Sequence, residues 1–207
     1  MRRLYSGAAA AIGWFALVLQ FVLILRLQDG LSAGEHIVNF FSFFTILSNI
    51  LAALMLTTAW AGMGGPFARP SVQTAITIYM TVTGLVYTFI LAGLWQPTGW
   101  QFVADSLLHY VMPVVIVLFW FLFVRKGTLR LGHLPWFLVF PLAYAIYSLV
   151  RGSAAEWYPY PFLDVSVHGM GAVLLNSVVM TVGFVLVGLL YIWLDRVLGG
   201  RRVEQPA

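Results

Sequence analysis

The chain has 207 residues, of which 61% are hydrophobic and only 9% are charged, whereas soluble domains carry about 25% charged residues. Together with a mean hydropathy of +0.93, this composition predicts an integral membrane protein and excludes an ordinary soluble domain. The absence of cysteine excludes disulfides, thiol nucleophiles and cysteine-ligated metals. The formal net charge of +4 comes from residues at the ends of apolar segments, where it indicates orientation in a membrane and gives no support to nucleic-acid binding.

Six apolar segments follow one another along the chain, and crossing a bilayer as a helix takes roughly 20 residues. They cover residues 5–26, 39–61, 72–94, 105–124, 134–151 and 171–195. The first exceeds the apolar core of a signal peptide, so we interpret it as an uncleaved span. Because the connecting stretches are short, we predict an all-α fold with six transmembrane helices in one bundle, forming a single transmembrane domain over residues 1–207.

Lysine and arginine are distributed unevenly between the two sides of these segments. Nine fall on one side, namely Arg2, Arg3, Arg69, Arg125, Lys126, Arg130, Arg196, Arg201 and Arg202, and two fall on the other, Arg26 and Arg151. Because cytoplasmic loops carry the excess of Lys and Arg, we predict that both termini are cytoplasmic. Loops 27–38, 95–104 and 152–170 then lie outside and, with their helix ends, hold five of the seven acidic residues. We therefore expect the chemistry on the outer side.

Polar and small side chains share one face of the second segment at helical spacing. The face consists of Ser42, Thr45, Ser48, Asn49, Ala52 and Ala53. Hydroxyl and amide groups have no partners in lipid, so we expect this face to lie against protein or trapped water. Thr45 lies about six residues below the start of the segment, which places it on the order of 10 Å beneath the outer surface. A threonine that only bonds its own helix backbone is the simpler alternative.

The fourth segment carries a histidine at a similar depth. Ionisable groups inside spans are costly and are functional by default, and His109 is such a group. Pro113 has no N–H to bond the carbonyl of residue 109, so we expect the helix to bend there. Asp105, one turn earlier, is placed to reach the imidazole ring. The predicted nucleophile and base are therefore Thr45 and His109, with Asp105 as an orienting residue.

Further polar residues fall in the outer half of the segments and predict a polar chamber with an aromatic lining. They are Gln20, Thr88, Tyr144, Tyr147, Ser148, Asn176 and Ser177. Among them, Asn176 and Tyr147, with Asn49 of the second segment, are candidate donors to an oxyanion. Glu35, His36, Asp164 and His168 are an alternative metal set with His109, but no spacing among them is diagnostic. We therefore predict no metal ion and no cofactor.

Three short motifs resemble a known family. They are Phe44-Thr45, then Leu108-His109 with Val111-Met112-Pro113, and Trp157 with Tyr160-Pro161-Phe162-Leu163. By these residues and by the order of spans, the chain resembles the androgen-induced-gene family of six-span membrane proteins, which includes bacterial relatives. Its animal members are threonine hydrolases of fatty acid esters of hydroxy fatty acids, so the resemblance implies that Thr45 is the nucleophile and His109 the base. It also implies a bacterial cytoplasmic membrane as the location.

The sequence thus favours an intramembrane hydrolase that takes a lipid ester from the membrane. The alternative is a small-molecule or proton-coupled transporter, or a binding protein, in which His109 and Asp105 relay protons through the same chamber. A third alternative is an assembly or scaffold protein in which the polar face of the second segment only packs helices.

Overall fold

The computed structural model describes residues 1–200, and Arg201 and Arg202 of the charge count above lie outside this range. The described chain is helical and contains no strand. Six of its helical stretches are long and apolar enough to cross a membrane: Arg2–Leu25, Phe44–Ala61, Pro70–Leu91, Gly99–Phe123, Leu131–Ala155 and Val165–Gly200. The predicted all-α bundle with six candidate spans is confirmed for this range, and it fits a multi-pass membrane protein.

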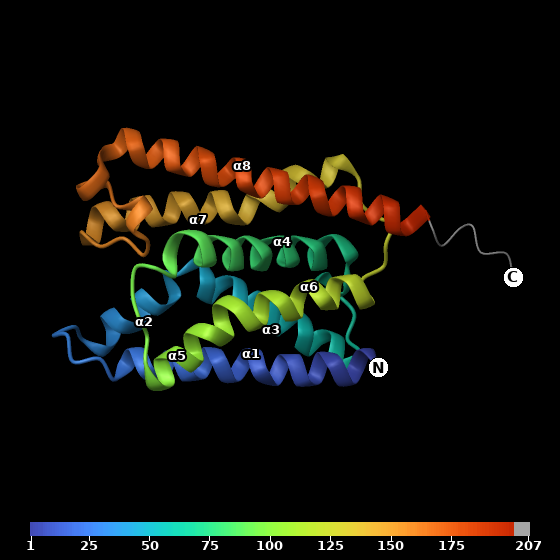
Figure 1. Cartoon of the computed structure of the whole chain (residues 1–207), viewed down its shortest axis with the longest axis horizontal. Coiled ribbons are helices and arrows are strands. Elements are labelled where there is room, and N and C mark those ends of the chain that lie inside the picture. The colour runs from blue at the N-terminus through green and yellow to red at the C-terminus, as the bar shows by residue number, and fades with distance from the viewer. Residues whose placement is uncertain (201–207) are drawn as a thin grey trace, which may run out of the picture.

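The helices run side by side along the long axis of the molecule (Figure 1). Their bounds are α1 Arg2–Leu25, α2 Ala33–Phe41, α3 Phe44–Ala61, α4 Pro70–Val86, α5 Gly99–Ser106, α6 Met112–Phe123, α7 Leu134–Ala155 and α8 Val165–Gly200. The helix α4 lies in the middle, because it contacts α3 and α6 on one side and α7 and α8 on the other. The chain enters α1 and leaves α8 at the same end of the bundle.

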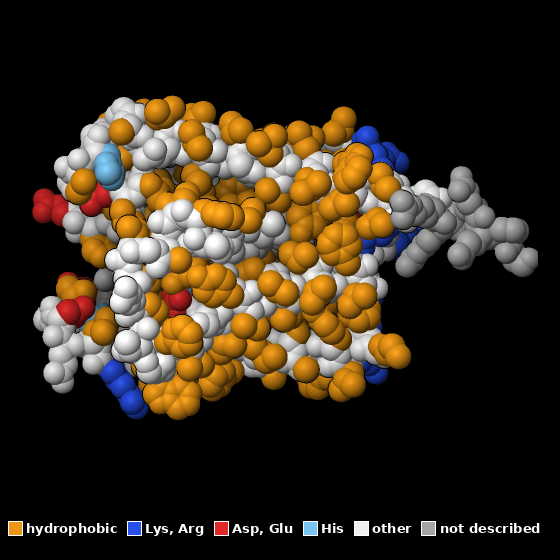
Figure 2. Space-filling model, in the orientation of Figure 1, with side chains coloured by type: hydrophobic (Ala, Val, Ile, Leu, Met, Phe, Trp, Pro, Cys, Tyr) orange, Lys and Arg blue, Asp and Glu red, His pale blue; other side chains and the backbone are white. Residues whose placement is uncertain are grey.

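Charged side chains gather at the two ends of the molecule, and the surface between them is mostly hydrophobic. In Figure 2, most visible Lys and Arg lie at the end where α1 begins, and acidic side chains lie mainly at the opposite end. The exposed residues along the helices include many leucines, valines and phenylalanines. Such a surface suits contact with acyl chains along the middle and with water at the ends.

The second predicted segment differs from the structure, because residues 39–61 are not one helix. The helix α2 ends at Phe41, and Phe43 has an extended backbone (φ −86°, ψ 129°) before α3 begins at Phe44. The carbonyl of Ser42, at the break, accepts a hydrogen bond from the Tyr144 hydroxyl of α7 (2.9 Å). The side chain of Ser42 donates to the Val38 carbonyl (2.7 Å). Thr45 therefore lies in the first turn of α3 and not well inside a span.

The polar face of this segment is buried, as predicted. Ser42, Ser48 and Asn49 are fully buried, and Thr45 is 6% exposed. The face lies against neighbouring helices, with α3 packing on α1 and α4. Protein groups thus surround polar side chains that would lack partners in lipid.

Two π-helical turns distort the helices beside this face. One, Leu107–Val111, joins α5 to α6 directly before Pro113, and the other, Tyr87–Leu91, continues α4. In the first of these turns the Met112 N–H bonds the Leu107 carbonyl, and π turns frequently occur at functional sites. The two helices are close here, since a Cβ on Gly84 would lie 3.1 Å from the Pro113 side chain and 3.4 Å from the His109 carbonyl oxygen.

At the other end of the bundle, a buried carboxylate fastens the connection between α6 and α7. Asp195 of α8 is 1% exposed and accepts hydrogen bonds from the backbone N–H groups of Thr128 and Leu129, each at 2.8 Å. Its own carbonyl accepts from Gly127 N (3.1 Å). One side chain thereby satisfies two backbone donors of a loop that lacks helical partners.

The variant Asp195→Ala should lower the free energy of unfolding by about 2–3 kcal/mol, because both N–H groups lose a charged acceptor. Unfolding followed by circular dichroism in detergent micelles measures it. The neighbouring exposed Arg196 provides the control, since Arg196→Ala should change the value by less than about 0.5 kcal/mol. Equal effects of the two variants would contradict this role of Asp195.

Candidate active site

A cavity of about 360 Å³ lies among α1, the start of α3, the two π turns and the loop before α8. Its lining brings together Thr45 and His109, the two residues predicted to act as nucleophile and base. Asp105 and Gln20, also expected from the sequence, line the same cavity. The remaining polar or aromatic lining residues are Phe40, Phe43, Tyr87, Trp95, Gln101 and Tyr160. The cavity therefore combines a hydroxyl, an imidazole and a carboxylate inside an apolar bundle.

The imidazole of His109 is held at one nitrogen. Its Nδ1 lies 3.1 Å from the backbone oxygen of Asp105 and 3.1 Å from Oδ1 of the same residue. The carbonyl has the better hydrogen-bond geometry, so the carboxylate acts mainly through its charge. Among residues 1–200, Nε2 has no hydrogen-bond partner. It is therefore the ring nitrogen that remains available to a molecule in the cavity, as in a base oriented by a carboxylate.

Tyr87 fixes both members of this pair. Its hydroxyl donates a hydrogen bond to Asp105 Oδ2, and its ring stacks on the His109 ring with centroids 3.8 Å apart and planes 12° apart. Asp105 and Tyr87 are 3% and 4% exposed, so these contacts are shielded from water. The orientation of the imidazole ring is therefore restrained by the stacked Tyr87 ring and by the contacts at Nδ1.

The Thr45 hydroxyl is held by a different residue. Its Oγ1 lies 3.2 Å from the Tyr160 hydroxyl, and the Thr45 N–H donates to the same Tyr160 oxygen, also at 3.2 Å. The first helical hydrogen bond of α3 comes from Leu47 N, so the Thr45 N–H belongs to the first turn, whose donors have no partner within the helix. Tyr160, from outside the helix, thus supplies the hydrogen-bond acceptor that an N-cap side chain usually provides for a first-turn N–H.

Burial raises the pKa of the Tyr160 phenol above its usual value, although the contacts with Thr45 act in the opposite direction. The hydroxyl therefore carries its proton at neutral pH. No direct hydrogen bond joins Thr45 to His109 in the described chain. The two residues share a cavity without being hydrogen-bonded to each other.

The three candidate oxyanion donors lie elsewhere. Asn49 Nδ2 donates to the carbonyls of Thr45 (2.8 Å) and Leu108 (3.2 Å), so it ties α3 to the π turn of His109. Asn176 donates to the Phe162 carbonyl (2.9 Å), and the Tyr147 hydroxyl lies 2.8 Å from Ser42 Oγ. None of the three lines the cavity. Their contacts position the backbone around it.

Two contributors were not assigned a role from the sequence. Tyr160 stands in one of the motifs that carry the family resemblance, but nothing in the chain order indicates that it meets Thr45, 115 positions away. Tyr87 looks like any core aromatic of an apolar segment. A further pair, Gln101 and Gln20, is joined by a hydrogen bond (2.8 Å) in the cavity wall.

No group of three or more His, Cys, Asp or Glu side chains within residues 1–200 is arranged to hold a metal ion. No family model, curated protein or solved structure matches the chain. The function is therefore inferred from the residues and distances described above.

The loop that presents Tyr160 depends on a glycine in α7. A Cβ on Gly152 would lie 2.0 Å from the ring of Tyr158, so only glycine lets this ring lie on the helix. Beyond it, the rings of Tyr160 and Phe162 stack with centroids 5.3 Å apart. The contact between Gly152 and Tyr158 therefore helps to place Tyr160 over the start of α3.

The variant Gly152→Ala should destabilise the protein by about 1–3 kcal/mol, because the added methyl group forces Tyr158 away. Thermal unfolding in detergent measures the loss. Ser153 is the matched control: it is exposed and bonds only within its own helix, so Ser153→Ala should cost less than about 0.5 kcal/mol. A Gly152→Ala protein as stable as Ser153→Ala would show that the ring has room to move.

Proposed function

We propose that this protein is a membrane hydrolase that cleaves a lipid ester with Thr45 as nucleophile and His109 as base. The observation that carries the proposal is that the Thr45 hydroxyl and the His109 imidazole, whose Nε2 has no hydrogen-bond partner among residues 1–200, line one cavity inside an apolar bundle. The positioning of His109 by Asp105 and Tyr87 supports it. The resemblance to the androgen-induced-gene family, which rests on the motifs around the same two residues, points the same way.

In this reaction His109 Nε2 takes the proton of Thr45 Oγ1 as that oxygen attacks the ester carbonyl carbon. The C–O bond to the alcohol then breaks, and the imidazolium gives its proton to the departing oxygen. Water, deprotonated by His109, attacks the acyl-threonine and releases the carboxylic acid. Catalytic hydrogen bonds are often unmade before substrate binds, so we expect the bound ester to bring Thr45 and His109 into contact.

The negative charge that develops on the carbonyl oxygen has donors close by. The Thr45 N–H lies at the N-terminus of α3, where the helix dipole favours negative charge. The protonated Tyr160 hydroxyl is 3.2 Å from the Thr45 nitrogen and oxygen. A carbonyl oxygen inserted between the Thr45 N–H and the Tyr160 hydroxyl would therefore receive a hydrogen bond from each of them.

The protein should react with a fluorophosphonate probe in detergent or membranes. Thr45→Ala should abolish labelling, because the attacking oxygen is gone, and His109→Ala should slow it by about 10²–10⁴-fold, because the base is lost. In-gel fluorescence against time gives both rates.

Thr58→Ala and His168→Ala are the controls, because Thr58 bonds only within its own helix and His168 is exposed. Both should label like the parent protein. Full labelling of both Thr45→Ala and His109→Ala would refute the assignment. Proton-coupled uptake into vesicles that is lost in His109→Ala and unchanged in Thr45→Ala would favour a transporter.

For the orientation we propose that the end where α1 begins faces the cytoplasm, because the basic residues gather there, and that the site faces outward. The chain has no cysteine, so single-cysteine variants report position without background. A membrane-impermeant maleimide added to intact bacterial cells should label Leu31→Cys, before α2, and leave Gly64→Cys, between α3 and α4, unlabelled. Both residues are exposed, so the opposite pattern would invert the topology.

A further inference from the structure

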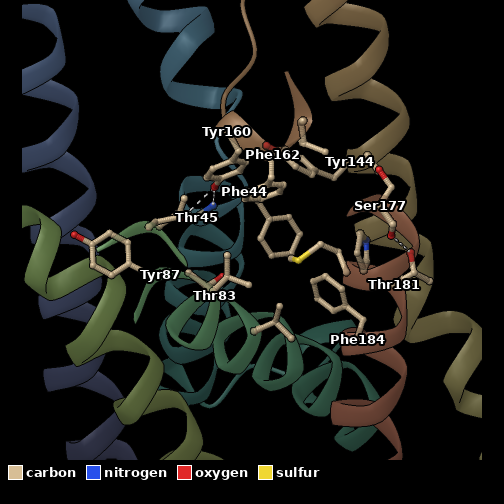
Figure 3. Close-up of a pocket in the computed structure, with 17 residues that line it drawn as sticks. Phe44, Thr45, Thr83, Tyr87, Tyr144, Tyr160, Phe162, Ser177, Thr181 and Phe184 are labelled. Carbon is tan, nitrogen blue, oxygen red and sulfur yellow. Dashed lines mark hydrogen bonds between the residues drawn. The ribbon is translucent and has the colours of Figure 1, made fainter. Parts of the chain in front are cut away.

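A second cavity lies on the far side of the Thr45–Tyr160 contact. It has a volume of about 80 Å³ and lies among α4, α7, α8 and the loop before α8 (Figure 3). Four residues line both cavities: Thr45, Tyr87, Leu91 and Tyr160. The candidate nucleophile therefore stands at the boundary between two spaces.

The hydroxyl groups in the wall of the second cavity are already hydrogen-bonded within the protein. Thr83 donates to the Tyr79 carbonyl (2.9 Å), Ser177 to the Val173 carbonyl and Thr181 to the Ser177 carbonyl (2.8 Å each). Tyr144 donates to the Ser42 carbonyl (2.9 Å). Each of these hydroxyl protons is used in a hydrogen bond within the protein. The wall therefore has few free hydrogen-bond donors for a polar ligand except at the end formed by Thr45 and Tyr160.

The rest of the wall is hydrocarbon and aromatic ring. Phe44 lies at the centre of the view in Figure 3, with Phe184 below it, and Val82, Pro141 and Met180 complete the apolar lining. The cavity around His109 is different, because it contains the partner-free Nε2 and the Gln20–Gln101 amide pair. The two spaces are therefore suited to different halves of one molecule.

The second cavity also lies close to the lipid-facing surface. It is lined by Ala145 of α7 and by Ser177 and Thr181 of α8, while their chain neighbours Ile146, Val178 and Val182 are exposed. The cavity is therefore separated from the outer surface by a single layer of side chains, at the interface between α7 and α8. An acyl chain longer than the cavity would pass between α7 and α8. It would have apolar surroundings both in the cavity and in the lipid outside.

We infer that the second cavity binds the acyl chain of the ester and that the alcohol half lies in the cavity of His109. The inference rests on the proposed function, and the chemistry fixes the direction. His109 protonates the departing oxygen, so the alcohol must lie on the imidazole side. The acyl carbon stays bonded to Thr45, and its chain must run to the other side, where the wall is apolar.

The test fills the second cavity from α7. Ala145→Phe places a ring in the cavity, whereas Ala143→Phe, two residues away and exposed, adds the same ring on the lipid side. Two measurements are made on each variant: crosslinking by a diazirine-bearing palmitate, mapped by mass spectrometry, and hydrolysis of a palmitoyl and a butyryl ester of the same alcohol.

We expect Ala145→Phe to lose crosslinking to α7 and α8 and to lower the palmitoyl-to-butyryl ratio of kcat/KM by about tenfold or more, because the longer chain loses its space. Ala143→Phe should change none of these. Thr181→Leu narrows the same cavity from α8. It is the variant to test if the Ala145→Phe protein does not fold.

Four outcomes separate this inference from the proposed function. An unchanged crosslink and an unchanged ratio in Ala145→Phe, or crosslinks that map to the cavity of His109, overturn the acyl-chain site while leaving the hydrolase standing. An equal loss for both esters also overturns it. If the parent protein hydrolyses neither ester and resists the fluorophosphonate, yet Ala145→Phe alone loses the crosslink, the chain-binding cavity stands and the hydrolase falls.

Discussion

The arrangement depends on a helix that breaks where the surroundings offer other hydrogen-bond partners. Inside a membrane protein an interrupted helix is tolerated only if protein groups satisfy the freed backbone atoms. At the junction of α2 and α3, the Tyr144 hydroxyl donates a hydrogen bond to the Ser42 carbonyl, and the Tyr160 hydroxyl accepts one from the Thr45 N–H. These two tyrosines come from α7 and from the loop that follows it. The break therefore joins the first half of the chain to the second and sets Thr45 at a helix start.

The imidazole of His109 is placed by a second set of distortions. Tyr87 and His109 each lie in a π turn, and their rings stack across the interface between the extended α4 and the α5–α6 helix. Gly84 permits the close approach that brings the turns together. Asp105 then bridges the two rings through its carboxylate.

Much of this was accessible from the sequence where the signal is local. Apolar length predicted six helices, helical spacing predicted the buried face with Thr45, and the four-residue interval predicted that Asp105 reaches His109. The break at Ser42 and Phe43 was missed because no glycine or proline marks it. The partners Tyr87 and Tyr160 were missed because their contacts join distant parts of the chain. Asn176 and Tyr147 have the depth expected of site residues, but their direction on the helix is set by packing that sequence spacing does not reveal.

The contact between Tyr160 and Thr45 has a consequence for selectivity in a medium full of hydrocarbon. If Thr45 and Tyr160 separate so that the two cavities join, the Thr45 N–H loses its hydrogen-bond acceptor. This loss costs about 1–3 kcal/mol. A plain alkyl tail offers no lone pair to that amide and leaves the cost standing, whereas a carbonyl group at the right depth offsets it. In the proposed reaction, this hydrogen bond therefore favours a chain with an acceptor at that depth over a plain alkyl tail by the same amount.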